Sequence, residues 1–161
     1  MKFQNTSGAV ALALLSLAFA PQPAAAATVI TDPAAFVQSV YARLAKGGDY
    51  IPPEDIYTPH LAALWALEGR EAHGEVGRID FLFWIDGQDG TPTDLRLRTI
   101  PVEGRLDRRI VVATFKNGEQ AEALKFYFQK GVSGWKLDDV VSLKGQAPWT
   151  LSVILKYGWV D

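Results

Sequence analysis

The feature that most constrains the fold is a strong hairpin pattern in the second half of the sequence. Residues 109–115 (RIVVATF) are rich in β-branched side chains, and they are followed by Asn117-Gly118, the dipeptide most typical of a tight hairpin turn. The next segment, residues 121–130, alternates between apolar and polar side chains, and its large apolar residues share one face: Leu124, Phe126 and Phe128. This pattern predicts two long antiparallel strands and excludes an all-helical fold.

Two further strands are predicted beside this hairpin. Residues 95–99 (LRLRT) alternate with a period of two, and residues 135–142 (WKLDDVVS) follow a glycine-containing turn at 131–134. Four successive strands joined by short turns favour an antiparallel meander.

Helices are predicted before and after the strands. Asp32-Pro33 and Thr58-Pro59 each combine a capping side chain with a proline at the first helical position. Apolar residues then recur at three- and four-residue steps on two helical faces: Phe36, Val37, Val40, Tyr41 and Leu44, and then Leu61, Leu64, Trp65 and Leu67. A short helical turn is expected near residues 52–55, and residues 148–157 predict a terminal helix.

These elements together predict an α+β domain. The N-terminal helices are expected to pack on a curved four-stranded antiparallel sheet, with a short C-terminal helix.

The first 26 of the 161 residues have the pattern of a signal peptide. Lys2 precedes an apolar run at residues 10–19, prolines interrupt the sequence at 21 and 23, and residues 24–26 offer an A-x-A cleavage site. The apolar run is shorter than the roughly 20 residues that a membrane-spanning helix needs, which argues against an N-terminal anchor. We therefore predict a cleaved signal peptide at residues 1–26, cleavage after Ala26 or Ala27, and a single periplasmic domain at residues 27–161.

Composition excludes several classes of function. The sequence has no cysteine, which rules out disulfides, thiol catalysis and a lipidated N-terminal cysteine. Its formal net charge of -2 gives no general attraction to nucleic acid. The two histidines, His60 and His73, do not have the spacing of a zinc site, and the glycines do not form a phosphate-binding or dinucleotide-binding motif. We expect no metal, no cofactor and no nucleic acid partner.

An acidic loop carries the first candidate site: Asp80, Asp86, Gln88 and Asp89. Paired carboxylates could act in acid–base chemistry or, with carbonyl oxygens, bind Ca²⁺, whereas the same residues also serve as ordinary turn and capping groups. The unbroken apolar run at residues 81–85 must partly face the core, so Asp80 and Asp86 are expected near the mouth of any cavity. His60 could form a dyad with one of these acids, or simply lie at the helix start.

Arginines carry the second candidate site, at Arg96, Arg98, Arg105, Arg108 and Arg109. Guanidinium groups bind carboxylates and phosphates, which suits an anionic ligand or an acidic partner. The interleaved acids Asp94, Glu103 and Asp107 favour instead a solvated face with internal ion pairs.

Tryptophans carry the third candidate site. Trp65 and Trp135 lie on apolar faces and are expected in the core, whereas Trp149 and Trp159 flank the terminal helix. Those two could form an aromatic surface for a partner, or hold the helix against the domain.

The sequence resembles the nuclear-transport-factor-2-like superfamily, and in detail a bacterial envelope family of unknown function. The features that carry the resemblance are Tyr41, the segments 56–61 (IYTPHL) and 134–140 (GWKLDDV), Asp80-Phe81 and Gln88-Asp89. The resemblance covers residues 32–157 and implies a cone-shaped α+β fold. Because that superfamily includes isomerases, dehydratases, transport adaptors and binding modules, it does not by itself imply one function.

Two functional hypotheses follow. The preferred one is a non-enzymatic periplasmic binding or interaction module, by analogy an envelope accessory or immunity-type protein. Its predicted partner is an envelope protein or a small anionic or apolar ligand, with a homodimer as a further option. The predicted ligand-binding residues are Trp84, Asp86, Gln88, Asp89, Arg98 and Tyr127. The predicted partner-binding residues are Arg96, Arg105, Arg108, Arg109, Trp149 and Trp159.

The alternative is a cofactor-free isomerase, lyase or hydrolase. Enzymes that resemble ketosteroid isomerase use a pocket aspartate as general base, with tyrosine or acid donors at the developing oxyanion. The residues expected to act in that case are Asp86, Asp80, His60 and Tyr127.

Overall fold

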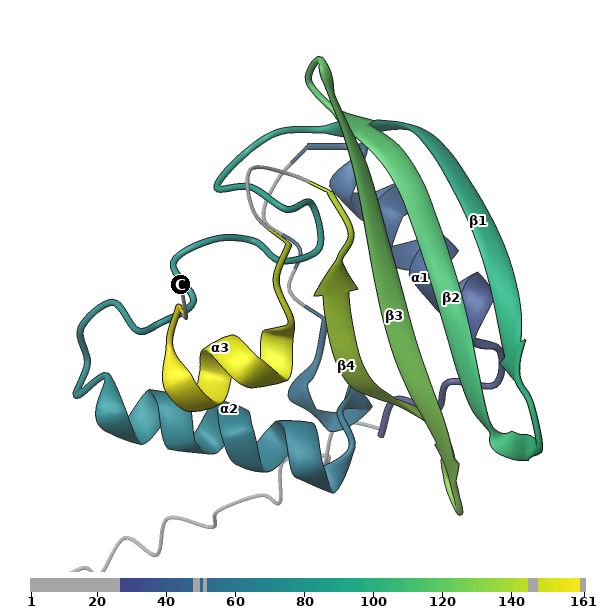
Figure 1. The fold of residues 1–161 in the computed structure, drawn as a ribbon, viewed down its shortest axis with the longest axis horizontal. Coiled ribbons are helices and arrows are strands. Elements are labelled where there is room, and N and C mark those ends of the chain that lie inside the picture. The colour runs from purple at the N-terminus through teal and green to yellow at the C-terminus, as the bar shows by residue number, and fades with distance from the viewer. Residues whose placement is uncertain (1–26, 48–49, 51, 145–147, 160–161) are drawn as a thin grey trace, which may run out of the picture.

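The computed structural model describes residues 27–47, 50, 52–144 and 148–159 (Figure 1). The predicted signal peptide at residues 1–26 lies outside the described residues. Within the described part of the chain, no helix is long and apolar enough to cross a membrane.

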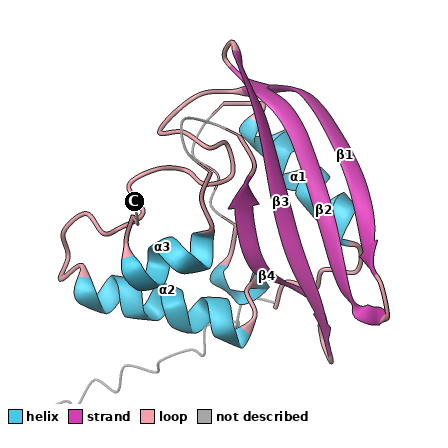
Figure 2. Cartoon of the chain, viewed as in Figure 1, coloured by secondary structure: helices cyan, strands magenta, loops and turns pink. Residues whose placement is uncertain are grey.

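The described residues form one antiparallel sheet and three α-helices, which confirms the predicted α+β class. The sheet contains β1 (Pro92–Val102), β2 (Arg105–Asn117), β3 (Gln120–Gly131) and β4 (Gly134–Ser142), in the order β1-β2-β3-β4. The helices are α1 (Pro33–Leu44), α2 (Pro59–Glu71) and α3 (Leu151–Tyr157), with a short 3₁₀ turn, η1, at Glu54–Ile56. Helix α1 lies across one face of the sheet, whereas α2 and α3 lie together on the β4 side (Figures 1 and 2).

The predicted capping residues begin the first two helices. Asp32 accepts a hydrogen bond from the backbone N–H of Ala35 at 2.8 Å, and the Thr58 hydroxyl accepts one from Leu61 N–H at 3.3 Å. Helix α3 begins differently, because Thr150 makes no side-chain cap. Asp139 of β4 accepts a hydrogen bond from Ser152 N–H at 3.0 Å in its place.

A β-bulge in β4 positions two neighbouring aspartates, Asp138 and Asp139, so that each binds the start of a different helix. Tyr127 pairs with Asp139 but Phe128 pairs with Leu137, so Asp138 is an extra residue in β4. Asp138 accepts a hydrogen bond from the Thr58 hydroxyl at 2.8 Å, while Asp139 binds the start of α3. The bulge therefore ties both helices of the β4 side to the sheet.

Three short segments cover the free edge of β4. Ile30, Tyr57 and Thr150 form isolated bridges to Trp135, Leu137 and Val141, respectively. An uncovered edge strand offers unpaired backbone groups to other chains, so these bridges protect the sheet on that side.

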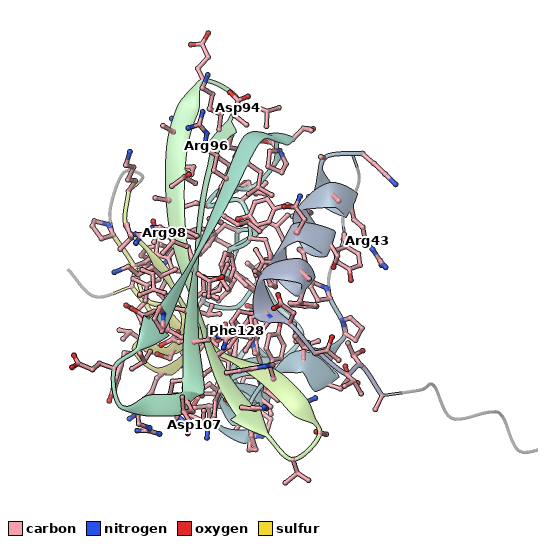
Figure 3. The ribbon with its side chains drawn as sticks, turned by 90° about the vertical axis from the view of Figure 1, so that its right-hand side faces the viewer. Arg43, Asp94, Arg96, Arg98, Asp107 and Phe128 are labelled. Atoms are coloured by element: carbon pink, nitrogen blue, oxygen red, sulfur yellow. The ribbon has the colours of Figure 1, made fainter. Side chains whose placement is uncertain are left out.

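The space between α1 and the sheet is filled with aromatic side chains. Trp84 stacks on Phe126 with ring centroids 4.9 Å apart, and Tyr41 packs edge-on against Phe115 at 5.0 Å. Trp84, Tyr41, Phe126 and Phe128 are all among the most completely buried side chains. The sheet face toward α1 is therefore a packed core, and the other face carries Arg96 and Arg98 (Figure 3).

Candidate functional site

An aromatic pocket lies between α2 and the segment at residues 77–84. Its volume is about 450 Å³, within the range of small-molecule sites. Most of its wall is apolar, and the side chains that define it are Tyr57, Trp65, Ile79, Phe81, Phe83 and Trp84. The side chains of the apolar run at residues 81–85 thus lie in two environments: Ile85 is in the core, and Phe81 is at the pocket wall.

Stacked rings make this wall continuous with the core. Tyr57 stacks on Trp65 at 6.2 Å between centroids, Trp65 contacts Phe83 at 6.0 Å, and Phe83 contacts Trp84 at 5.2 Å. Since Trp84 is packed against Phe126, the wall is held by the same aromatic cluster that fills the domain. Such a wall suits a flat, apolar ligand.

Of the polar groups that line the pocket, Tyr57 is neutral and Glu68 is paired, while Glu54 is exposed. Burial and the nearby Glu54 raise the pKa of Tyr57 to about 12, so its phenol remains neutral. Glu68 is only 6% exposed, and its carboxylate pairs with the guanidinium of Arg78 at 2.8 Å. The buried Nε1–H of Trp65 has no hydrogen-bond acceptor among the described residues, which costs free energy.

Arg78 connects the pocket rim to α3. Its side chain pairs with both Glu71 and Glu68 and donates to the carbonyl of Leu155 at 3.2 Å. The hydrogen bonds to Glu71 and Glu68 raise the pKa of Arg78 further, so the charge of Glu68 stays neutralised.

A second polar site lies at the end of the core, around Asp86. One carboxylate oxygen of Asp86 accepts a hydrogen bond from the Trp149 indole N–H, and the other accepts one from the Ser142 hydroxyl, both at 2.6 Å. Asp86 has a φ of 53°, a left-handed conformation that aspartate and asparagine adopt more readily than most residues. Two residues before Asp86, the backbone carbonyl of Trp84 accepts a hydrogen bond from the Tyr41 hydroxyl at 2.6 Å.

Glu122 of β3 completes this second site, and its role there was not predicted from the sequence. It is 2% exposed, and burial, the charge of Asp86 and a side-chain hydrogen bond with Asp86 raise its pKa. Its Oε2 atom has no partner among the described residues. The sequence does carry a signal, because Glu122 continues the two-residue period of Leu124 and Phe126 and so falls on the buried face of the strand.

The burial of Glu68 was likewise not predicted from the sequence. It lies three residues after Trp65 and four after Leu64, so it continues the apolar face of α2. An acidic residue on the apolar face of a helix indicates a buried carboxylate that is paired with a cation.

The structure does not bring the four residues of the enzyme hypothesis together. His60 and Asp80 are exposed, Asp86 is half-buried beside Trp149, and Tyr127 lies on the sheet face away from the core. No hydrogen bond or ion pair joins any two of these four residues within the described part of the chain.

Among the predicted ligand-binding residues, only Trp84 lines the aromatic pocket. Gln88 and Asp89 are exposed, and Asp89 is held through its backbone carbonyl, which accepts from Asn117 at 3.2 Å. Arg98 is exposed on β1, opposite Val112.

The arginines at the β1–β2 hairpin surround a cavity of about 410 Å³ that Tyr127 also lines. Arg105 forms two hydrogen bonds with Asp107, both of 3.0 Å, and Arg108 lies 3.5 Å from Asp138. The guanidinium of Arg109 lies over the Trp135 ring at 5.0 Å. Two of the three positive charges are thus matched by acids, as the interleaved sequence indicated, while Arg96 lies apart and exposed on β1.

The two C-terminal tryptophans have different environments. Trp149 is 6% exposed and bound to Asp86, so its side chain belongs to the core and not to an exposed surface. Trp159 is 53% exposed and contacts Phe81 at 5.6 Å between centroids. Phe81 lies against both rings, with Trp149 at 5.2 Å.

Within the described ranges, no group of three or more acidic or histidine side chains is arranged to hold a metal ion. Comparisons with protein-family models, with curated proteins and with solved structures found no match.

Proposed function

We propose that this protein is a non-catalytic binding module whose ligand is a small, flat, largely apolar molecule. The observation that carries the proposal is the aromatic pocket of about 450 Å³, walled by stacked rings, in which the buried acid Glu68 is paired with Arg78. The separation of His60, Asp80, Asp86 and Tyr127 argues against the enzyme hypothesis.

The cellular setting of this proposal comes from the sequence. The signal-peptide pattern of residues 1–26 supports export to the periplasm. The order of helices and four antiparallel strands supports a nuclear-transport-factor-2-like cone, as does the resemblance at residues 56–61 and 134–140. We propose both as the context in which the pocket operates.

A pocket-filling substitution tests the proposed function. Gly69 lines the pocket, and a Cβ atom at this position would meet open space. Gly69→Leu should therefore occupy part of the pocket without strain, and it should strengthen α2 because glycine is a poor helix former. The probe is N-phenyl-1-naphthylamine, a neutral dye whose fluorescence increases in apolar surroundings.

We expect saturable dye binding by the natural sequence and at least a roughly tenfold weaker affinity for Gly69→Leu, the cost of losing about 1.4 kcal/mol of contact. The matched control is Ala66→Leu, which adds the same side chain to an exposed position of α2 that does not line the pocket. Equal dye binding by all three proteins would refute the pocket as the binding site.

A further inference from the structure

The Asp86–Glu122 site contains more hydrogen-bond contacts than its fixed hydrogens can supply. The Ser142 hydroxyl has one hydrogen but lies 2.6 Å from Asp86 Oδ2 and 2.7 Å from the carbonyl of Lys144. Glu122 lies two residues from Leu124, the partner of Ser142 in the sheet, and its buried Oε2 atom has no partner among the described residues. An ionised Glu122 would thus be buried next to the charge of Asp86 without a cation to compensate it. A proton shared by the two carboxyl groups removes one of the two negative charges and, when it lies on Asp86, lets Ser142 donate to the carbonyl of Lys144.

The surroundings of the pair favour keeping that proton on Glu122. Burial raises the pKa of Glu122 most, and Asp86 raises it further, whereas Lys144 lowers it. Tyr41 of α1 faces the same site, and burial raises its pKa well above the ordinary value, so the phenol stays neutral. The β2 residue opposite Glu122 is the uncharged Phe115. Glu122 is thus the titrating group of this site.

Contacts lead from this acid pair to the aromatic pocket. Asp86 directly follows the run at residues 81–85, which supplies Phe81, Phe83 and Trp84 to the pocket wall. Asp86 also holds the indole of Trp149, and Trp149 packs edge-on against Phe81. A displacement of Asp86 would move two supports of the same wall.

We propose that Asp86 and Glu122 share one proton, and that loss of this proton separates the two side chains and loosens the aromatic pocket wall between residues 79 and 86. The second half of this inference rests on the proposed function, because it treats the pocket as a binding site. The first half concerns the acid pair alone.

The direction of the effect follows from the sign of the pKa shift. A group whose pKa is raised by folding stabilises the folded state while it is protonated, and this stabilisation is lost as pH rises through the raised pKa. Above that pH the two negative charges repel each other in a poorly solvated site. The pocket should therefore bind more tightly at acidic than at alkaline pH.

The first experiment follows Glu122 directly. Carbon NMR of the carboxyl groups should show one glutamate that titrates at clearly higher pH than exposed glutamates, and this signal should be absent from Glu122→Gln. That variant keeps the shape of the side chain and a permanent donor toward Asp86, but it cannot ionise. An assigned Glu122 signal that titrates together with the exposed glutamates would overturn the shared proton.

The second experiment measures N-phenyl-1-naphthylamine binding from about pH 5 to about pH 8. We expect the affinity of the natural sequence to fall by about fivefold or more with rising pH, within the usual range for coupled sites, and that of Glu122→Gln to stay constant. The control is Glu119→Gln, which removes the same charge from an exposed position near Glu122 and should keep the pH dependence.

The outcomes separate the two proposals. A high-titrating Glu122 without dye binding at any pH would refute the proposed function and leave the shared proton intact. A high-titrating Glu122 with pH-independent binding would refute the coupling to the pocket. Loss of pH dependence in Glu122→Gln, but not in Glu119→Gln, is the result that supports the whole inference.

Discussion

Two buried glutamates in this domain are stabilised in opposite ways. Glu68 on α2 is 6% exposed and faces the guanidinium of Arg78, whereas Glu122 on β3 is 2% exposed and faces another acid, Asp86. Both lie on the apolar face of an element that otherwise carries large hydrophobic residues. A buried carboxyl group is costly unless its charge is compensated. At Glu68 a cation provides the compensation, and at Glu122 a proton does.

The two solutions respond differently to the environment. An arginine does not lose its charge at physiological pH, so the Glu68–Arg78 pair is a fixed link between α2, the pocket rim and α3. A proton exchanges with water, so the link between Asp86 and Glu122 depends on pH. The same small domain thus contains one contact that persists at all physiological pH values, Glu68–Arg78, and one that depends on pH, Asp86–Glu122.

The largest expected effect comes from removing the cation beside Glu68, so that neither buried glutamate has one. Arg78→Met would leave Glu68 buried without its cation. An uncompensated carboxylate at the site of Glu68 costs about 3 kcal/mol of unfolding free energy. Urea unfolding of the natural sequence and the variant measures this loss.

The control for that substitution is the double variant Arg78→Met with Glu68→Met. Replacing both partners with apolar side chains removes the buried charge, so most of the lost stability should return. A double variant as unstable as the single one would show that the ion pair is not what Arg78 contributes.

An intermediate effect is expected at Tyr41, which lies beside the acid pair but keeps its own proton. Tyr41→Phe would leave the Trp84 carbonyl in the core without its 2.6 Å donor. We expect a loss of about 2 kcal/mol, the cost of one unsatisfied buried group. Because Tyr41 remains neutral, this loss should be equal at acidic and neutral pH. A loss that changes with pH would place Tyr41 inside the shared-proton network.

The smallest effect is expected from Asp86→Asn. Asparagine tolerates the positive φ at this position and can still accept from Trp149 through its amide oxygen. Its amide N–H₂ can donate to an ionised Glu122, so the repulsion at high pH disappears. We expect stability curves that cross, with a gain of about 1 kcal/mol over the natural sequence at alkaline pH. Parallel curves in urea unfolding would contradict this prediction.

The fold was largely predictable from local patterns. Asn117-Gly118 marked the central hairpin, and Asp32 and Thr58 marked the first two helices, because turn and capping chemistry involves residues that are close in sequence. The bulge at Asp138 was harder to predict from the sequence. Its trace in the sequence is a three-residue step between the buried residues Leu137 and Val140, where strict alternation predicts two.

The candidate site was predictable only in part. The sequence singled out Trp84 and Asp86, but it did not decide between an exposed and a packed position for Trp149, and it did not indicate Glu68 or Glu122. Whether a charged side chain on an apolar face is buried depends on a partner supplied by another element. For Glu122 that partner is Asp86, and for Trp149 it is the same carboxylate, 63 positions away. Sequence periodicity does not contain this pairing.

The covered edge of β4 has a consequence for how the molecule reaches its final state. The segments that close this edge come from the beginning, the middle and the end of the domain, at Ile30, Tyr57 and Thr150. The first of them has nothing to pair with until nearly the whole sequence has been synthesised, because its partner Trp135 lies in the last strand. Contacts of such long sequence separation form slowly. We therefore expect β4 to be the last part of the sheet to become protected against hydrogen exchange during refolding.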